Sequence, residues 1–192
     1  MQRIFVISAV LLGFSPALHA DPKVGDKAPE LDVAVDQAGK PVTVASKRGS
    51  WVLMTFGAHW CEPCAKELPV WDRVAQAYAG RIEFWAVNLS NEIKDGKKFH
   101  QKLKLAHLFR VYLPQDKSKS AEAYETGTFP STFVVDPTGT VREIHKGFKK
   151  GDEAVLRKAL DALLVAPAAV APAAVAPSAG PAGPAAARGS SK

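Results

Sequence analysis

The chain has 192 residues with a formal net charge of +6 at pH 7, and it contains only two cysteines. No nucleic-acid-binding motif accompanies the positive charge, which argues against a nucleic-acid partner. About 145 residues remain between two distinctive terminal segments, enough for one domain with a proper hydrophobic core.

Residues 1–20 have the layout of a secretory signal peptide. Arg3 supplies a positive charge, an apolar run extends from residue 4 to residue 14, and cleavage is expected after Ala20, with Ala17 as an alternative. The apolar run is shorter than the roughly 20 residues that span a bilayer, so an uncleaved anchor is the weaker interpretation. We therefore expect a mature protein that is periplasmic or otherwise exported, with no stable membrane insertion after cleavage.

From residue 31 to residue 165 the sequence alternates extended and helical patterns. Strands are predicted at Leu31–Val35, Val42–Val44, Trp51–Phe56, Ile82–Leu89, Leu108–Leu113, Thr132–Val135 and Val141–Ile144. Helices are predicted at Ala65–Ala79, 94–105, Ala121–Tyr124 and from a cap at Asp152 onward, the last with an apolar stripe of Val155, Leu156, Ala159, Leu160, Leu163 and Leu164. This alternation indicates an α/β sandwich with a central sheet, forming one domain over residues 21–165.

Residues 166–192 differ in composition from the predicted domain. A Val-Ala-Pro-Ala-Ala unit begins at Val165, recurs at Val170 and recurs with one change at Val175. Repeated proline rules out a continuous helix, and the segment has too little bulky apolar surface to offset the entropy of ordering. We expect a disordered Ala/Pro-rich tail, with a tether or wall spacer as the alternative role.

The two cysteines, Cys61 and Cys64, are separated by two residues and lie between a predicted buried strand and a predicted helix. A disulfide in so short a loop constrains the unfolded chain little, which disfavours a purely structural bridge. A structural zinc site needs about four ligands, and the chain has no second cysteine pair. The spacing therefore favours a redox-active disulfide, although a structural bridge and a metal site remain alternatives.

The expected position of Cys61 at the start of a helix explains how it could react. Unpaired backbone N–H groups and the helix dipole stabilise a thiolate there, and the thiolate attacks disulfides. Pro63 suits the first helical turn because it needs no N–H partner. Glu62 opposes the thiolate through like-charge repulsion, and Cys64, one turn further, is expected to be more buried and to resolve a mixed disulfide.

Longer motifs around these residues carry a resemblance. They are Phe56-Gly-Ala-His-Trp-Cys-Glu-Pro-Cys64 with Pro69, Phe129-Pro-Ser-Thr-Phe-Val-Val-Asp136, and the N-terminal Val24-Gly-Asp-Lys-Ala-Pro29. Over about residues 23–164 the chain resembles the exported TlpA/ResA-like thiol-disulfide oxidoreductases, which have the thioredoxin fold. The resemblance implies a three-layer sandwich with a central mixed β-sheet, an N-terminal β-extension and a helix–strand insertion after Leu89.

The resemblance also implies a substrate-binding face around the cysteines. It predicts a cis peptide bond at Phe129-Pro130, opposite the disulfide, that offers backbone to a bound peptide. Without the resemblance, Pro130 would be only a proline at a strand entry. Trp60 is expected to pack beside Cys61, with a place in the core as its alternative, and the substrate-binding residues are then Trp60, Glu62, Pro63, Phe129 and Pro130.

One position departs from thioredoxin itself, which carries a buried Asp six residues before the first cysteine. That position is Thr55 here. Glu67 shares a helix face with Cys64 and is the candidate replacement as proton acceptor, as the ResA-like branch implies. The alternative for Glu67 is a surface glutamate paired with a Lys or Arg. His59 is expected to be a solvated loop residue with at most a modest electrostatic role.

These features predict an exported thiol-disulfide oxidoreductase, with Cys61, Cys64 and Glu67 as the catalytic residues and no cofactor or metal. It is expected to act as a monomer on protein substrates with cysteines or disulfides and to exchange electrons with a membrane thiol reductant or oxidant. The resemblance implies the reducing direction, for example on the cysteines of apocytochrome c. A disulfide-forming oxidant is one alternative. A thiol peroxidase is another, although it would want Thr where Ala58 stands, and a copper-binding carrier is the third.

Overall fold

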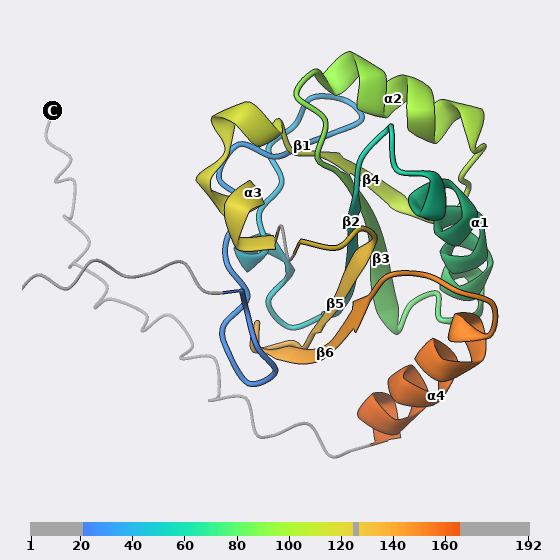
Figure 1. Cartoon of the computed structure of the whole chain (residues 1–192). Helices are drawn as coiled ribbons and strands as arrows, with labels where there is room; N and C mark the ends of the chain where they lie inside the picture. Colours follow the sequence, from blue (N-terminus) through green and yellow to red (C-terminus); the bar gives the residue numbers. More distant parts are fainter. Residues whose placement is uncertain (1–20, 125–126, 166–192) are drawn as a thin grey trace, which may run out of the picture.

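The computed structural model describes residues 21–124 and 127–165, which form a central β-sheet between two layers (Figure 1). The six-stranded sheet has the order β1-β4-β3-β2-β5-β6. Strands β2, β3 and β4 are parallel to one another. The pairs β1–β4, β2–β5 and β5–β6 are antiparallel. The strands are β1 Val35–Asp36, β2 Trp51–Gly57, β3 Ile82–Asn88, β4 Phe109–Tyr112, β5 Ser131–Val135 and β6 Val141–Lys146.

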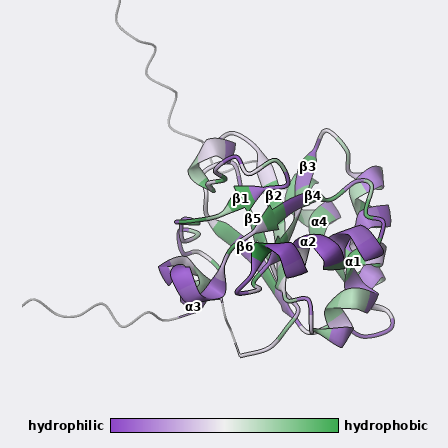
Figure 2. Cartoon of the chain, turned by 90° about the horizontal axis from the view of Figure 1, so that it is seen from above, coloured by the Kyte–Doolittle hydropathy of each residue, from purple (hydrophilic) through white to green (hydrophobic). Residues whose placement is uncertain are grey.

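Helices cover the two faces of the sheet unequally. One face carries α1, α2 and α4, whose apolar residues pack with Leu53, Phe84 and Val134. The other face carries α3 and the N-terminal segment, packed on Met54 and Trp85. The helices are α1 Glu62–Ala77, α2 Ile93–Lys102, α3 Lys119–Tyr124 and α4 Asp152–Val165, with short 3-10 turns η1 Ala45–Lys47 and η2 Gln115–Lys117. Because both faces are covered, the central strands are apolar along their length and the helices are polar on their outer sides (Figure 2).

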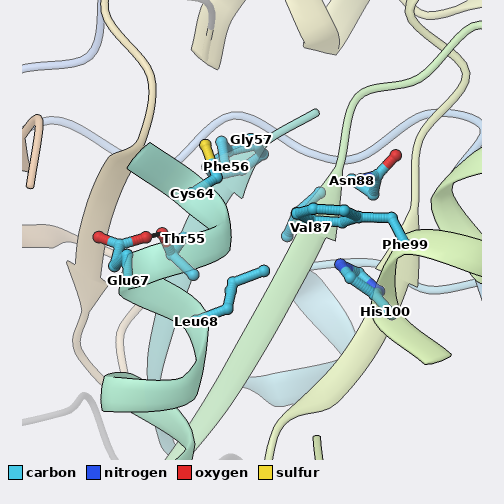
Figure 3. Close-up of a pocket in the computed structure, with 10 residues that line it drawn as sticks. All are labelled: Thr55, Phe56, Gly57, Cys64, Glu67, Leu68, Val87, Asn88, Phe99 and His100. Atoms are coloured by element: carbon cyan, nitrogen blue, oxygen red, sulfur yellow. Dashed lines mark hydrogen bonds between the residues drawn. The ribbon is translucent and has the colours of Figure 1, made fainter. Parts of the chain in front are cut away.

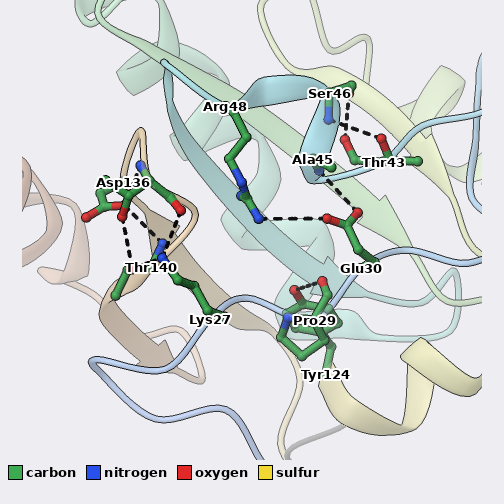
Figure 4. Close-up of polar contacts among 11 residues, drawn as sticks. Lys27, Pro29, Glu30, Thr43, Ala45, Ser46, Arg48, Tyr124, Asp136 and Thr140 are labelled. Carbon is green, nitrogen blue, oxygen red and sulfur yellow. Dashed lines mark hydrogen bonds and ion pairs between the residues drawn. The ribbon is translucent and has the colours of Figure 1, made fainter. Parts of the chain in front are cut away.

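Polar contacts fasten the N-terminal segment to the second face of the sheet (Figure 4). The Tyr124 hydroxyl donates to the Pro29 carbonyl at 2.6 Å, and Lys27 donates to the Thr140 hydroxyl at 3.0 Å. β1 adds backbone pairing to β4. The N-terminal β-extension is thus an edge of the sheet together with a covering loop.

Most predicted elements are confirmed, with shifts at their ends. Two predicted strands are corrected: residues 42–44 form a loop rather than a strand, and of the strand predicted at Leu31–Val35 only Val35 is extended, as part of β1. The helix predicted from Ala65 begins at Glu62, because Cys61 is its N-cap. The predicted helix–strand insertion is α2 with β4, placed between β3 and β1. The predicted stripe on the last helix is wrong at Val155, which is 58% exposed, because α4 buries only the face that carries Leu156 and Leu160.

The predicted signal peptide and the Ala/Pro-rich tail lie outside the described residues. Within the described parts of the chain, none of the helices has the length and apolar character needed to cross a membrane.

Asp32 joins the N-terminal segment to α3. Its carboxylate accepts hydrogen bonds from the hydroxyls of Ser118 and Ser120 at 2.6 and 2.7 Å and from the backbone N–H of Lys119 at 2.8 Å. Although partial burial acts to raise the pKa of Asp32, the hydrogen bonds from Ser118, Ser120 and Lys119 lower it to about 2. The charged form of Asp32 is therefore the one that stabilises the fold.

Asp32→Asn is expected to lower the free energy of unfolding at pH 7 by about 1 kcal/mol, after allowance for solvent screening of this exposed carboxylate. Since the folded pKa is depressed, the stabilisation is present above about pH 4 and is lost as the pH falls towards 2. Urea unfolding at pH 7 and pH 2.5 measures the effect, with the exposed Asp116→Asn as control. Equal losses at the two pH values would show that the charge of Asp32 is not responsible.

Candidate active site

The two cysteines form a disulfide at the N-terminus of α1. Cys61 is the N-cap residue, and its sulfur accepts the backbone N–H of Cys64 at 3.2 Å. Cys61 is 5% exposed and Cys64 1% exposed. The expected difference is confirmed: Cys61 is the sulfur nearer to solvent and Cys64 the inner one.

The two residues between the cysteines are both exposed, and Pro63 occupies the first turn of α1 as expected. The Glu62 carboxylate pairs with the Lys66 ammonium one turn later, at 2.7 Å. The hydrogen bond and charge of Lys66 lower the pKa of Glu62. Lys66 thus offsets part of the negative charge beside Cys61. So exposed an ion pair contributes little to the stability of the fold.

A shallow groove of about 370 Å³ lies directly beside Cys61. Its walls are Trp60, Glu62 and Pro63 on one side and residues 127–129 on the other. The ring of Trp60 is 62% exposed and its centroid is 5.9 Å from that of Phe129. The alternative of Trp60 as a core residue is therefore wrong. The Phe129–Pro130 peptide bond is cis, as the resemblance implies, and Pro130 is buried behind the groove wall.

Glu67 lies inside the protein behind the disulfide, on the same helix as Cys64. It is 1% exposed, and its carboxylate accepts hydrogen bonds from the hydroxyls of Thr55 at 2.7 Å and Thr132 at 3.3 Å. Figure 3 shows the contact with Thr55. The alternative of a surface glutamate is wrong. Burial raises the pKa of Glu67 to about 7, against the opposing effect of the Thr55 hydrogen bond, so near neutral pH it can take up or release a proton.

Gly57, the last residue of β2, allows the inner sulfur to rest against the sheet. A Cβ atom at Gly57 would lie only 2.5 Å from the Cys64 sulfur. Gly57 belongs to the motif around the cysteines, but the sequence gives no sign of this role, because its close neighbour is known only once α1 is placed on the sheet.

His59 is exposed, as expected, but one of its ring nitrogens lies within hydrogen-bond distance of a side chain. His59 Nδ1 lies 2.7 Å from the Ser90 hydroxyl, and the His59 backbone N–H also bonds to that hydroxyl at 3.3 Å. Ser90 follows β3, so these contacts fix the loop before Trp60 to the neighbouring strand. Among the described residues, no group of three or more His, Cys, Asp or Glu side chains could hold a metal ion.

Sequence comparisons match the same region of the chain. The sequence model of the AhpC/TSA family matches residues 24–144. The thiol-disulfide oxidoreductase ResA of Geobacillus kaustophilus is 30% identical over 125 residues, covering 65% of this chain and 70% of ResA. The thioredoxin-like protein YneN of Bacillus subtilis is 27% identical over 137 residues, covering 71% of this chain and 79% of YneN.

Solved structures share the fold. A Chlorobium tepidum protein assigned as thiol:disulfide interchange protein DsbE matches with a TM-score of 0.67 and 29% identity, over 75% of this chain and 99% of that one. The thioredoxin domain of a Bacteroides vulgatus thiol-disulfide oxidoreductase matches with a TM-score of 0.61 and 25% identity, over 74% and 98% of the two chains.

A thioredoxin-like sheet with a two-cysteine disulfide at the head of its first helix defines the class of the thiol-disulfide oxidoreductases, which are enzymes. The chain belongs to the AhpC/TSA family and, within it, to the ResA-type thiol-disulfide oxidoreductases.

Proposed function

We propose that the protein is an exported disulfide reductase that passes two electrons from the Cys61–Cys64 dithiol to disulfides in other exported proteins, apocytochrome c among them. The observation that carries the proposal is the position of Cys61 in the lining of an open groove, with Glu67 buried on the helix of Cys64. The groove gives a peptide access to the nucleophile, and the carboxylate gives the inner thiol a proton acceptor.

The reaction has two steps. The Cys61 thiolate attacks one sulfur of the substrate disulfide, which forms a mixed disulfide and releases one substrate thiolate. Cys64 then gives its proton to Glu67, attacks the Cys61 sulfur and releases the second substrate thiolate. The Cys61–Cys64 dithiol is thereby oxidised by two electrons to the disulfide, the substrate disulfide is reduced by the same two electrons, and the two substrate thiolates take up protons from solvent.

The groove supports an extended polypeptide as the substrate. Trp60 and Phe129 offer apolar and aromatic surface, which binds peptide side chains, and the backbone of residues 127–129 forms the facing wall. The exposed Glu62 and Pro63 complete the proposed contact surface. Pro130 is buried behind the wall, so its proposed contribution is the cis backbone that it forms with Phe129.

The charge beside the nucleophile supports the reducing direction. A dithiol whose thiolate form is strongly stabilised is a poor electron donor, which is the basis of a strong oxidant. Glu62, between the cysteines, acts in the opposite sense because its negative charge disfavours the Cys61 thiolate, and Lys66 offsets this only in part. The oxidised form is therefore favoured, as a reductant requires.

The cellular part of the proposal rests on the sequence of residues 1–20, which has the pattern of an export signal. An exported dithiol lies in an oxidising compartment, so a membrane thiol reductant must return it to the reduced state. We propose that the mature protein works as a monomer with this partner.

The redox potential of the Cys61–Cys64 pair, measured in glutathione or dithiothreitol buffers, tests the direction of electron flow. A value near about −270 mV supports a reductant, whereas a value near about −120 mV would make the protein an oxidant. Failure to reduce insulin disulfides, together with stoichiometric copper binding in equilibrium dialysis, would favour a copper carrier. Turnover of peroxide would favour the peroxidase, for which Ala58 is the wrong residue.

Trp60→Ala is expected to lower the second-order rate of disulfide exchange with a peptide substrate about tenfold, since it removes the exposed wall of the groove. Stability should hardly change, because the Trp60 ring is mostly solvent-exposed. Stopped-flow exchange and thermal unfolding measure the two effects. Val155→Ala removes an exposed apolar side chain on α4 and serves as the control; equal rates in both variants would argue against a substrate role for Trp60.

A further inference from the structure

Asn88 lies beside the inner cysteine, at the end of the neighbouring strand. Asn88 is paired with Gly57 in the parallel register of β3 and β2, so the two residues face the same side of the sheet about 4.8 Å apart. Gly57 is the residue against which the Cys64 sulfur rests. Asn88 therefore lies on the strand next to the residue that the sulfur contacts, and its side chain faces α2.

The polar atoms at this place lack partners. Neither amide atom of Asn88 has a hydrogen-bond partner, although the residue is only 2% exposed. The same holds for Nδ1 of His100, on α2, which is 1% exposed. An unpaired buried donor or acceptor costs about 1–3 kcal/mol, so three such atoms around one place call for a partner.

These residues line a common pocket (Figure 3). Its space is about 10 Å³, which is close to the requirement for one water molecule. The pocket is lined by Thr55, Phe56, Gly57, Cys64, Glu67, Leu68, Val87, Asn88, Phe99 and His100. It is thus small and largely buried, and its lining combines apolar side chains with Asn88, His100, Cys64 and Glu67, the last being the proposed proton acceptor.

α2 is shaped to close this pocket. Gly96 lies against the Asn88 side chain, where a Cβ atom would collide with the Asn88 amide oxygen. One turn later, His100 packs its ring on Tyr112, with centroids 5.4 Å apart. The helix–strand insertion therefore forms one wall of the pocket behind the cysteines.

We propose that this pocket binds one ordered water molecule, held by the Asn88 amide and His100 Nδ1, which donates a hydrogen bond to the Cys64 thiolate during disulfide exchange. Asn88 and His100 are then positioning residues that act on Cys64 through the water. This role rests on the proposed disulfide exchange. When Cys64 gives its proton to Glu67 and attacks the Cys61 sulfur, the water stabilises the transient negative charge and remains unchanged.

The charges around the pocket are compatible with this role. The titratable groups that line it are Cys64 and Glu67 from α1 and His100 from α2, and the lining residues of β2 and β3 contribute none. Burial, aided by the charge of Arg110, lowers the pKa of His100 to about 4. His100 is therefore a neutral imidazole near pH 7, able to accept from or donate to the water through Nδ1.

A crystal structure of the full chain in the disulfide form, at a resolution that shows ordered water, tests the site directly. We expect density within hydrogen-bond distance of the Asn88 amide and His100 Nδ1, and within about 3.5 Å of the Cys64 sulfur. An empty pocket, or an Asn88 amide bonded directly to a protein group, would overturn the proposal. Neither outcome depends on the direction of electron flow.

The role in exchange is tested by titrating Cys64 as the only thiol, in the Cys61→Ser background. Adding Asn88→Leu, which keeps the volume but removes the amide, is expected to raise the pKa of the Cys64 thiol by about one unit, a tenfold loss of thiolate. Asn91→Leu changes an exposed asparagine three residues later and is the matched control. An unchanged titration with Asn88→Leu would overturn the proposal.

His100→Phe provides the second variant, because it keeps a ring against Tyr112 but removes Nδ1. We expect His100→Phe to raise the pKa of the Cys64 thiol as well, with an about threefold loss of thiolate. This variant keeps the test valid should Asn88→Leu fail to fold. A folded His100→Phe protein with an unshifted titration would contradict the assignment of His100. Insulin reduction by the unaltered protein tests the proposed function separately.

Discussion

Cys61→Ser is expected to abolish disulfide exchange, lowering the rate of insulin reduction at least about a thousandfold, because a serine hydroxyl remains protonated where the thiolate would attack. The fold should persist, since Cys61 lies at the head of α1 and a serine oxygen can still accept the N–H of Cys64 as an N-cap. Insulin turbidity and circular dichroism measure the two effects.

Cys64→Ser separates the roles of the two sulfurs. This variant keeps the nucleophile but cannot resolve the mixed disulfide, so it should accumulate a covalent complex with a substrate protein that is visible on a non-reducing gel. Cys61→Ser should form no such complex through the inner thiol, which is buried. If the two variants trapped substrate equally, the distinction between nucleophile and resolving cysteine would be wrong.

Glu67→Gln has the second large expected effect. It should slow disulfide exchange about tenfold to a hundredfold and remove the inflection near pH 7 from the pH–rate profile, because the pKa of Glu67, raised by burial to about 7, places its proton transfer in this range. Glutamine retains an oxygen for the Thr55 hydroxyl. Rates measured from pH 5 to pH 9 test this, with the exposed Glu122→Gln as control.

Although Glu67→Gln slows the reaction, it should increase the free energy of unfolding above pH 8. Since the folded pKa of Glu67 lies above its ordinary value of 4.5, the folded state binds its proton more tightly, and stability falls as the pH rises from about 4.5 through about 7. Above pH 8 the ionised Glu67 costs about 3 kcal/mol, and Glu67→Gln should recover much of it. Unfolding curves of the parent and the variant at pH 5 and pH 8 measure this difference in stability. A variant no more stable than the parent at pH 8 would show that burial does not destabilise the ionised Glu67.

The charge of Asp152 contributes to this behaviour. Asp152, at the start of α4, acts to raise the pKa of Glu67, and it is bonded to His145 at 3.0 Å. The sequence analysis assigned nothing to His145 and gave Asp152 only a capping role. The raised pKa of Glu67 therefore depends in small part on a residue 85 positions later in the chain.

The elements that could be predicted from sequence are those whose signal is local. The apolar run from Trp51 and the periodic segment after Cys64 predict β2 and α1, since burial of a whole strand or of one helix face determines their pattern. The cysteine pair and Pro130 could be placed because their motifs have fixed spacing. The exposure of Val155 could not be predicted, because the apolar stripe of α4 is wider than the face that the helix buries.

The rest of the site depends on contacts between distant segments. Glu67 accepts a hydrogen bond from Thr132 of β5, and Asn88 lies beside Gly57, which the inner sulfur contacts, through the register of β2 with β3. Neither partner lies near α1 in the sequence, so helix periodicity cannot reveal it. Lys66 is the exception: an oppositely charged residue four positions after Glu62 is a recognisable pair on a helix.

The groove and the pocket border different members of the cysteine pair. Trp60 and Phe129 contact whatever approaches Cys61, whereas Asn88 and His100 border only Cys64. In the proposed mechanism, contact with the substrate and stabilisation of the Cys64 thiolate therefore belong to separate sets of side chains. We expect substitutions in the aromatic wall to change which peptides bind, and substitutions at Asn88 or His100 to change the reactivity of Cys64, each without the other effect.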